Sequence, residues 1–263
     1  MLFIVDESGS MGGEHAWLGS MVSSLEADLV ANGVTGNRYG LVGFGATSTH
    51  TVSNAMGHTH SVGGGDWGTS GDFATATGGL VASGGFEDGW QAIDFALSNY
   101  TFRSNAALNI VLVTDEDRDI TSGSNYTYSS ILADLASYNA LLNVVVNCQL
   151  NNGTSIGVDS DGNRYVADGS GGYTTSTGGN QSGTCFGTTK ANYVDMAWAT
   201  GGASWDLNIL RSGGNNAASF TEAFTDIKAQ EVVDQEVPEP AALGLFGLGL
   251  AGLGVAARRR KTH

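Results

Sequence analysis

The sequence predicts an α/β fold: a doubly wound, mostly parallel sheet with helices on both faces. Apolar runs such as Leu2–Val5 and Asn109–Thr114 are uninterrupted, which is typical of parallel strands covered on both faces. Segments with the helical spacing of apolar residues lie between these runs, and strands that alternate with helices form parallel sheets. Ligands of such sheets bind beyond the carboxyl ends of the strands, so a functional site is expected at that edge.

The first third of the chain follows this alternation. After the strand at 2–5, apolar residues recur at positions 18, 21, 22, 25 and 29, which predicts one stripe of an amphipathic helix that ends near Asn32-Gly33. Residues 39–44 predict a second strand with small residues for close packing. The polar, glycine-rich stretch 45–79 predicts an edge strand and a short helix around 72–79.

The middle of the chain repeats the pattern. Residues 90–97 and 131–136 predict helices, and 109–114 and 142–146 predict buried strands. Residues 150–190 are rich in Gly, Ser, Thr and Asn, which favours hairpins or loops on one edge of the sheet.

The last elements precede an extended linker. Residues 191–198 predict a short helix that stops at Gly201-Gly202, and 205–207 begin a strand or turn. Apolar residues at 220, 224 and 227 line a final helix.

The charge of the chain is strongly negative except at its C-terminus. The chain holds 11 Lys and Arg residues against 26 Asp and Glu residues. Four of the basic residues lie in Arg258–Lys261 and no acidic residue follows Glu239, so residues 1–240 carry 7 basic and 26 acidic side chains, a net charge of −19. Such a surface repels phosphate backbones and suits divalent cations, so we expect no binding of nucleic acid.

The two cysteines, Cys148 and Cys185, lack the spacing of a metal site. In an exported protein they would form one disulfide, and in the cytosol they would be free thiols. Sequence does not decide between these alternatives, because a disulfide requires the two backbones to approach each other.

Residues 237–261 have three parts in a fixed order. The first part is an extended segment, Val237, Pro238, Glu239 and Pro240. The second is a run of 17 uncharged residues from Ala241 to Ala257. The third is a basic cluster, Arg258, Arg259, Arg260 and Lys261. As a helix, the uncharged run would be about 25 Å long, slightly short of a membrane's hydrocarbon core. The basic cluster would hold its end on the cytoplasmic side. The alternative is a buried C-terminal helix of the globular domain.

This order of parts resembles the PEP-CTERM sorting signal of Gram-negative bacteria. The resemblance implies recognition by an exosortase-type membrane protease next to Pro-Glu-Pro and transient anchoring in the inner membrane. It also implies release of the mature protein to the cell envelope, outer surface or extracellular matrix.

The sequence therefore divides into a domain at 1–232 with a loop-rich insertion at 150–190, a linker at 233–240 and a sorting segment at 241–263. A sorting segment of this kind works only after export, yet no signal peptide precedes the first strand, which begins at Met1. We therefore expect the precursor to start upstream of Met1.

The first strand ends in a turn rich in oxygen ligands, Asp6-Glu7-Ser8-Gly9-Ser10. Asp6 supplies a charge, Ser8 and Ser10 supply neutral hydroxyls, and Gly9 lets the turn close tightly. Hard divalent cations such as Mg²⁺ bind oxygen ligands of this kind and keep open positions for water or an incoming ligand. The alternative is that these side chains only cap the following helix.

The turn resembles the metal-ion-dependent adhesion site of the von Willebrand factor A (vWA) family, whose ligands come from three loops at one edge of the sheet. Asp115 follows the strand at 109–114, where the family has an acidic residue that usually reaches the metal through water. The loop before the helix at 90–97 lacks the family's threonine and resembles the integrin β-subunit variant instead. That comparison implies Glu87 as the ligand, with Asp88 as the second choice. The additional carboxylate implies tighter metal binding, tolerance of Ca²⁺ and a weaker pull on an acidic partner.

Two other motifs favour ordinary structural roles. Asp159-Ser160-Asp161-Gly162-Asn163 departs from the EF-hand pattern, which favours a hairpin turn. His58-Thr59-His60 lies in polar sequence, which favours a solvated loop.

Taken together, the sequence predicts an exported domain that binds one divalent cation, Mg²⁺ or Ca²⁺, through Asp6, Ser8, Ser10, Glu87 and Asp115. A carboxylate of a surface protein or polysaccharide would complete the metal's shell, and no catalysis is expected. One alternative is a structural matrix protein in which the metal only stabilises the fold, and another is an enzyme of similar architecture. Metal-dependent binding of a partner distinguishes the first two.

Overall fold

The computed structural model describes residues 1–51, 56–120, 122–178 and 183–235. The predicted sorting segment and its Val-Pro-Glu-Pro sequence lie outside these residues. Among the helices that are described, we find none with the length and hydropathy needed to span a membrane.

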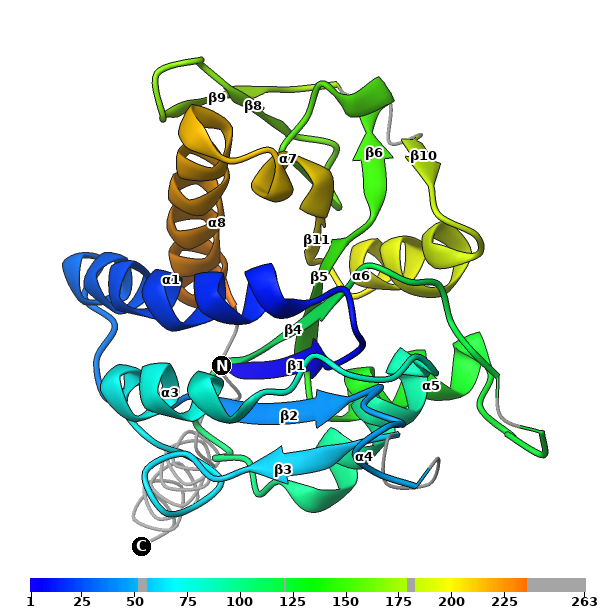
Figure 1. Cartoon of the computed structure of the whole chain (residues 1–263). Coiled ribbons are helices and arrows are strands. Elements are labelled where there is room, and N and C mark those ends of the chain that lie inside the picture. The colour runs from blue at the N-terminus through cyan, green and yellow to red at the C-terminus, as the bar shows by residue number, and fades with distance from the viewer. Residues whose placement is uncertain (52–55, 121, 179–182, 236–263) are drawn as a thin grey trace, which may run out of the picture.

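A nine-stranded sheet in the order β3-β2-β1-β4-β5-β11-β7-β8-β9 forms the centre of the molecule (Figure 1). Its central strands run parallel: β2 (Gly40–Phe44), β1 (Leu2–Asp6), β4 (Leu108–Thr114), β5 (Ala140–Val146) and β11 (Ala203–Asp206). The short strand β3 (His58–His60) pairs antiparallel with β2 at one edge. This confirms the predicted doubly wound, mostly parallel sheet.

Helices cover both faces of the sheet (Figure 1). One face packs against α1 (Gly12–Ala31), α3 (Ser70–Ala76) and α8 (Gly214–Asp234), and the other against α4 (Gly89–Asn99), α5 (Tyr128–Ser137) and α6 (Asp195–Ala199). Successive residues of a strand point to opposite faces, so Phe3 and Val5 enter the first core whereas Leu2 and Ile4 enter the second. This two-sided burial explains why the strand sequences are uninterrupted apolar runs.

Helix α1 forms where its apolar stripe was predicted, but it is longer. The five apolar residues of the stripe are buried, and the helix ends at the predicted position, with Asn32 as its C-cap. In the N-terminal half of the helix, Trp17 packs edge-on against Phe220 and Phe224 of α8. These contacts hold the helix that follows the Asp6 turn against α8.

The glycine-rich segment 150–190, for which hairpins or loops were predicted, contains hairpins. Strands β7 (Gly157–Asp159), β8 (Arg164–Ala167) and β9 (Tyr173–Ser176) extend the sheet in antiparallel fashion beyond β11. The side chain of Asp159 caps the β7–β8 turn by accepting hydrogen bonds from the backbone N–H groups of Asp161 (3.0 Å) and Asn163 (2.8 Å). The segment Asp159–Asn163 is therefore a hairpin turn, as predicted.

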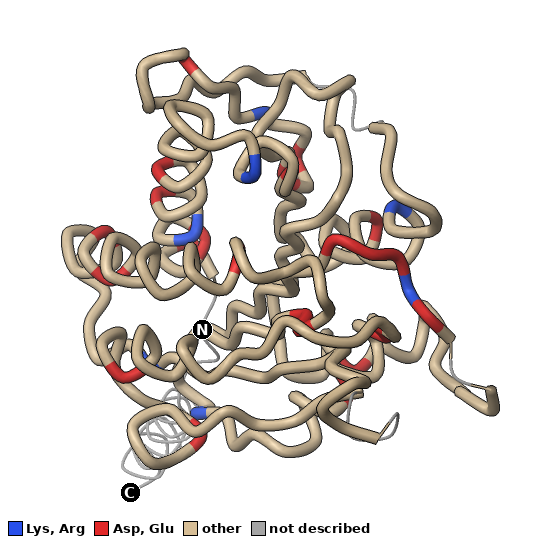
Figure 2. The backbone as a smooth tube through the Cα atoms, in the orientation of Figure 1, with Lys and Arg blue, Asp and Glu red and all other residues tan. Residues whose placement is uncertain are grey.

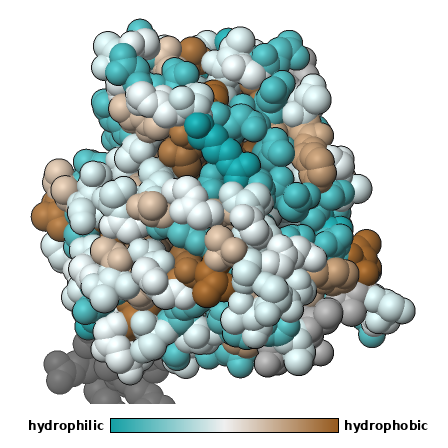
Figure 3. All heavy atoms as spheres, in the orientation of Figure 1, coloured by the Kyte–Doolittle hydropathy of each residue, from teal (hydrophilic) through white to brown (hydrophobic). Residues whose placement is uncertain are grey.

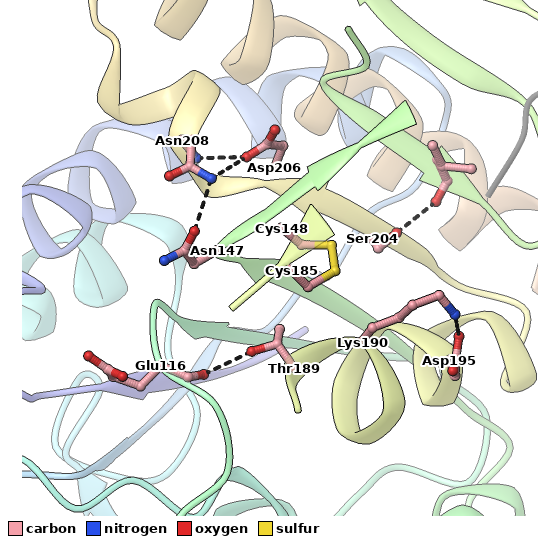
Figure 4. The surroundings of a disulfide bond; sticks show 11 residues. Glu116, Asn147, Cys148, Cys185, Thr189, Lys190, Asp195, Ser204, Asp206 and Asn208 are labelled. Carbon is pink, nitrogen blue, oxygen red and sulfur yellow. Dashed lines mark hydrogen bonds and ion pairs between the residues drawn. A yellow bond between two sulfur atoms is a disulfide. The ribbon is translucent and has the colours of Figure 1, made fainter. Parts of the chain in front are cut away.

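The two cysteines are joined in a disulfide (Figure 4). Strands β6 (Cys148–Leu150) and β10 (Gly183–Cys185) form a separate antiparallel pair in which Cys148 lies directly opposite Cys185. Of the two alternatives left open by the sequence, the structure has the disulfide.

The remaining elements are short. The region predicted as a helix at 191–198 is a π-helical turn, η3 (Lys190–Val194), that continues into α6. Two 3-10 turns, η1 (Thr77–Gly79) and η2 (Asn151–Gly153), follow α3 and β6. Helix α7 (Leu207–Arg211) directly follows β11 and was not predicted.

Candidate metal centre

The three predicted ligand loops meet where the winding of the sheet reverses. Strands β1 and β4 are neighbours, and the chain builds the sheet outward from them in opposite directions. In doubly wound sheets this reversal point leaves a crevice beyond the carboxyl ends of the strands. Asp6 is the last residue of β1, and Asp115 directly follows β4.

Asp6 is fully buried and held by two hydrogen bonds. Its Oδ1 accepts a hydrogen bond from the backbone N–H of Ser8 at 2.7 Å, and its Oδ2 accepts one from the hydroxyl of Thr114 at 2.8 Å. The first bond closes the turn after β1, and the second ties the carboxylate to the end of β4. The carboxylate is therefore fixed between two strand ends.

Ser8, Ser10 and Asp115 form a chain of oxygens beside Asp6. The hydroxyl of Ser10 donates to Oδ1 of Asp115 at 2.9 Å, and its oxygen lies 3.4 Å from the hydroxyl of Ser8. Arg211 of α7 pairs with Oδ2 of Asp115 at 2.9 Å and with Glu14 at 2.6 Å. Because Arg211 neutralises part of its charge, Asp115 is better suited to hold a hydroxyl or water than to bind an ion directly.

A glycine brings Glu87 next to Asp6. Gly45, after β2, has a φ of +87°, and a Cβ there would lie 2.8 Å from Oδ1 of Asp6 and 3.2 Å from Cγ of Glu87. Asp6 and Glu87 thus lie on either side of a space that only glycine leaves open. Backbone hydrogen bonds from Gly9 to Gly84 (3.1 Å) and from Ser83 to Glu7 (2.8 Å) join the first two loops.

Asp6 and Glu87 both lie in surroundings that disfavour their charge. Burial, with a smaller contribution from the charge of Asp115, raises the pKa of Asp6 to about 7, despite the hydrogen bonds from Ser8 and Thr114. Burial, the nearby charge of Asp6, and a hydrogen bond with the side chain of Asp119 together with its charge raise the pKa of Glu87 to about 8. Among the described residues, neither carboxylate forms an ion pair with a Lys or Arg side chain. Two adjacent buried carboxylates without a basic partner fit a bound cation.

Asp88, the second candidate in this loop, is engaged elsewhere. Its buried carboxylate pairs with Nε and Nη2 of Arg118 at 2.7 and 2.9 Å. It also caps α4 by accepting hydrogen bonds from the backbone N–H groups of Trp90 (3.1 Å) and Gln91 (3.3 Å). Of the two neighbours, Glu87 is the one that reaches Asp6.

The segment after β4 makes this edge of the sheet strongly acidic. Asp115, Glu116 and Asp117 are consecutive, and Asp119 follows Arg118; they form the red run interrupted by blue in Figure 2. Burial and the neighbouring charges of Asp115 and Asp117 raise the pKa of Glu116. Figure 3 shows the surface in the same orientation, coloured by hydropathy. The field of this edge attracts cations.

The tail has a recognised sorting signal. Residues 236–261 match the PEP-CTERM protein-sorting motif. The match confirms the signal identified in the sequence, and a PEP-CTERM motif indicates export through the membrane to the cell envelope. No curated protein matches the chain.

Solved structures similar to the chain include vWA proteins. A von Willebrand factor type A structure from Catenulispora acidiphila is 16% identical, with a TM-score of 0.37, and the match covers 55% of this chain and 32% of that one. BatB from Bacteroides thetaiotaomicron is 14% identical, with a TM-score of 0.48, covering 88% of this chain and 98% of BatB. A mussel byssus thread matrix protein with a zinc-occupied MIDAS motif is 12% identical, with a TM-score of 0.41, covering 55% and 34%. The chain thus spans about a third of the first and third of these structures, and the similarities carry no information on its function.

The structure corrects the interpretation of His58-Thr59-His60. These residues form the edge strand β3 and not a solvated loop, and both imidazoles face Glu7. Nε2 of His58 lies 2.8 Å from Oε2 of Glu7, and Nε2 of His60 lies 3.1 Å from Oε1. Burial raises the pKa of Glu7, but the two imidazoles and the N–H of Val81 outweigh it and hold the pKa at about 2.

Sequence reasoning also missed residues that support the first site. Thr114 has a local signal, because it ends a buried strand next to Asp115. Arg211 and Glu14 have none, because their ion pair joins residues 197 positions apart.

Proposed function

We propose that this chain is an exported binding domain that uses one divalent cation, Mg²⁺ or Ca²⁺, to hold a carboxylate of a surface protein or polysaccharide. One observation carries the proposal: the buried carboxylates of Asp6 and Glu87 lie together at the reversal point of the sheet, without a basic partner among the described residues. Ser8 and Ser10 add neutral oxygens beside them. This all-oxygen donor set fits a hard divalent cation.

Each ligand has a distinct part in the proposed site. Asp6 and Glu87 would bind the ion directly, because in the described part of the chain no Lys or Arg side chain pairs with either carboxylate. The hydroxyls of Ser8 and Ser10 would complete the protein's share of the shell, with Asp115 holding Ser10 in place at 2.9 Å. The proposed role is binding by coordination, without turnover.

The burial pattern leaves one side of the site open. Asp6, Ser8 and Glu87 are buried, whereas Gly9 and Ser10 are exposed. An acidic group of a partner would therefore approach past Ser10. In the extracellular space, domains that bind Ca²⁺ work with dissociation constants of about 10⁻⁴–10⁻³ M, and we expect an affinity in this range.

The test is metal-dependent binding of a partner. Untagged protein would be applied to an immobilised acidic polysaccharide, a neutral polysaccharide and isolated bacterial envelopes, in Mg²⁺, Ca²⁺ or chelator. Asp6→Asn removes a ligand charge, and Asp161→Asn is the matched control because its side chain is exposed in the β7–β8 turn.

Retention that needs both the ion and Asp6 supports the proposal. Stabilisation by metal, without retention on any of these surfaces, would favour the alternative in which the metal only stabilises a structural matrix protein.

We further propose that an exosortase-type protease removes the tail next to Pro-Glu-Pro after transient anchoring in the membrane. The PEP-CTERM match at 236–261 supports this processing. The intact mass of surface-released protein should lack residues 241–263, and release of the uncleaved chain would contradict it.

A further inference from the structure

The edge strand β3 presents two imidazoles to one buried carboxylate. His58 and His60 are two positions apart in a strand, so their side chains lie on the same face. His58 pairs with Gly43 of β2, and a Cβ at Gly43 would lie 2.1 Å from Oε2 of Glu7 and 2.8 Å from Nε2 of His58. Only a glycine at this position lets Glu7 cross β2 and reach His58.

Three ligand atoms converge here. One ring nitrogen from each imidazole and a carboxylate oxygen of Glu7 lie within 4.8 Å of one another. The two contacts with Glu7 are 2.8 and 3.1 Å. A tetrahedral Zn²⁺ with bonds of about 2.0–2.1 Å holds its ligand atoms ~3.3 Å apart, so the cluster needs to open by only a few tenths of an ångström.

One oxygen of the cluster lacks a hydrogen bond. Oε2 of Glu7 is buried and, in the part of the chain that is described, accepts no hydrogen bond of good geometry, although Nε2 of His58 is 2.8 Å away. A nitrogen and an oxygen this close, but not aligned for a hydrogen bond, can become two ligands of one ion after the small opening described above. A cation between them would satisfy both atoms.

The surroundings hold the carboxylate and leave the imidazoles accessible. The backbone N–H of Val81 donates to Oε1 of Glu7 at 2.9 Å, and the side chain of Glu7 is fully buried. The side chains of His58 and His60 are 21% and 16% exposed, which gives an ion access from solvent. A third imidazole, His50, packs against His58 with ring centroids 4.4 Å apart.

We propose that Glu7, His58 and His60 form a second metal site, which takes a borderline transition-metal ion such as Zn²⁺, with water or His50 in the fourth position. Imidazole nitrogens with one carboxylate suit Zn²⁺, whereas the all-oxygen set around Asp6 suits Mg²⁺ or Ca²⁺. The two sites are separate, because Asp6 turns to Thr114 of β4 whereas Glu7 turns to β2 and β3. The second site therefore does not depend on the proposed function.

An ion in this site would also connect the first two ligand loops to the sheet edge. Glu7 lies in the turn after β1, and its backbone and side-chain oxygens bind Ser83 and Val81 of the segment that leads to Glu87. The bound ion would add β3 to this junction. Zn²⁺ is thus expected to raise the melting temperature of the full chain.

The experiment is a metal titration of the untagged, metal-free full chain. Co²⁺ serves as a spectroscopic probe, because tetrahedral Co²⁺ with nitrogen ligands absorbs visible light strongly. Zn²⁺ affinity is measured by competition with a chromogenic chelator. We expect one equivalent of Zn²⁺ and the tetrahedral Co²⁺ spectrum, and His58→Gln and His60→Gln should each weaken binding at least tenfold.

Two control variants test whether Zn²⁺ binds at this cluster and not at the Asp6 site or at another histidine. Asp6→Asn should keep the Co²⁺ spectrum while losing any response to Mg²⁺. His15→Gln is the matched histidine replacement, because Nε2 of His15 lies 2.8 Å from the backbone oxygen of Asp6 and His15 is not among the three residues of the cluster. Melting in chelator shows whether each variant is folded. The proposal is overturned if the wild type binds no stoichiometric Zn²⁺, if both histidine variants bind as the wild type does, or if Asp6→Asn abolishes the Zn²⁺ site.

Discussion

Replacing Asp88 by asparagine should destabilise the protein and leave its response to metal intact, whereas replacing Glu87 by glutamine should do the reverse. The two residues are neighbours in the chain, but their carboxylates have different surroundings. Asp88 is paired with Arg118 and caps α4, and Glu87 lies beside Asp6. The pair of variants therefore separates a structural carboxylate from a metal ligand.

The cost at Asp88 follows from its burial. Its side chain is fully buried and that of Arg118 is 3% exposed, so Asp88→Asn leaves a buried guanidinium without its counter-charge. Removing one partner of such a pair costs about 3–5 kcal/mol. Asparagine keeps an oxygen for the N-cap, so the roughly 1 kcal/mol of the cap is retained. Adding Arg118→Met should recover much of the loss, because no charge is then left unpaired.

For Glu87→Gln we expect unchanged stability without metal and loss of the stabilisation by metal. Burial, the charge of Asp6, and a hydrogen bond with the side chain of Asp119 together with its charge raise the pKa of Glu87 to about 8, so its ionised form is disfavoured in the folded protein. A neutral glutamine should not destabilise the metal-free protein at neutral pH. It should, however, abolish the stabilisation by metal, which is about 2.7 kcal/mol for an ion at 100 times its dissociation constant.

Urea unfolding in chelator and in saturating Mg²⁺ or Ca²⁺ measures both quantities for each variant. If Asp88→Asn removes the metal response and leaves stability in chelator unchanged, Asp88 is the ligand and the assignment of Glu87 is wrong.

Three further predictions concern the ion, the disulfide and the pH dependence. Mg²⁺ or Ca²⁺ at 100 times its dissociation constant should raise the melting temperature by about 5–10 °C, and Asp6→Asn should remove this gain; an equal gain in Asp6→Asn would place the ion elsewhere. Replacing Cys148 and Cys185 by serine should cost about 4 kcal/mol in urea unfolding, because the disulfide closes a loop with a sequence separation of 37; equal stability would contradict the pairing. Burial raises the pKa of Asp206 to about 6 despite its hydrogen bonds from Asn208, so its contribution favours folding at low pH and is lost as the pH rises from about 4 to about 6. Relative to Asp206→Asn, the wild type should therefore lose on the order of 2 kcal/mol of unfolding free energy between pH 4 and pH 7, and parallel pH profiles would refute the shift.

The strands and helices that the sequence predicts well are those in which the pattern of apolar residues within the segment itself shows which faces are buried. The runs in β1, β4 and β5 are apolar throughout because both faces of the sheet are covered. The stripe of α1 is visible because one face of the helix packs on the core. The turn of Asp6, Ser8 and Ser10 is likewise local to the end of β1.

The features that were missed depend on contacts between distant segments. An edge strand was predicted within 45–79, but its position at His58–His60 was missed, because β3 has only three residues and its place is set by contacts with Gly43 and Glu7. Arg211 reaches Asp115 and Glu14 only because α7 follows β11 at this edge of the sheet. The preference for Glu87 over Asp88 came from the family resemblance, but the ion pair that engages Asp88 was missed because Arg118 comes from another loop.

The most direct test of the central claim is a crystal structure of the protein soaked in Mn²⁺, which replaces Mg²⁺ or Ca²⁺ and is located by its anomalous scattering. The account predicts an anomalous peak bound by oxygens of Asp6 and Glu87, beside the hydroxyls of Ser8 and Ser10. Absence of a peak at this site, or a peak only between Glu7 and the two histidines of β3, would contradict it.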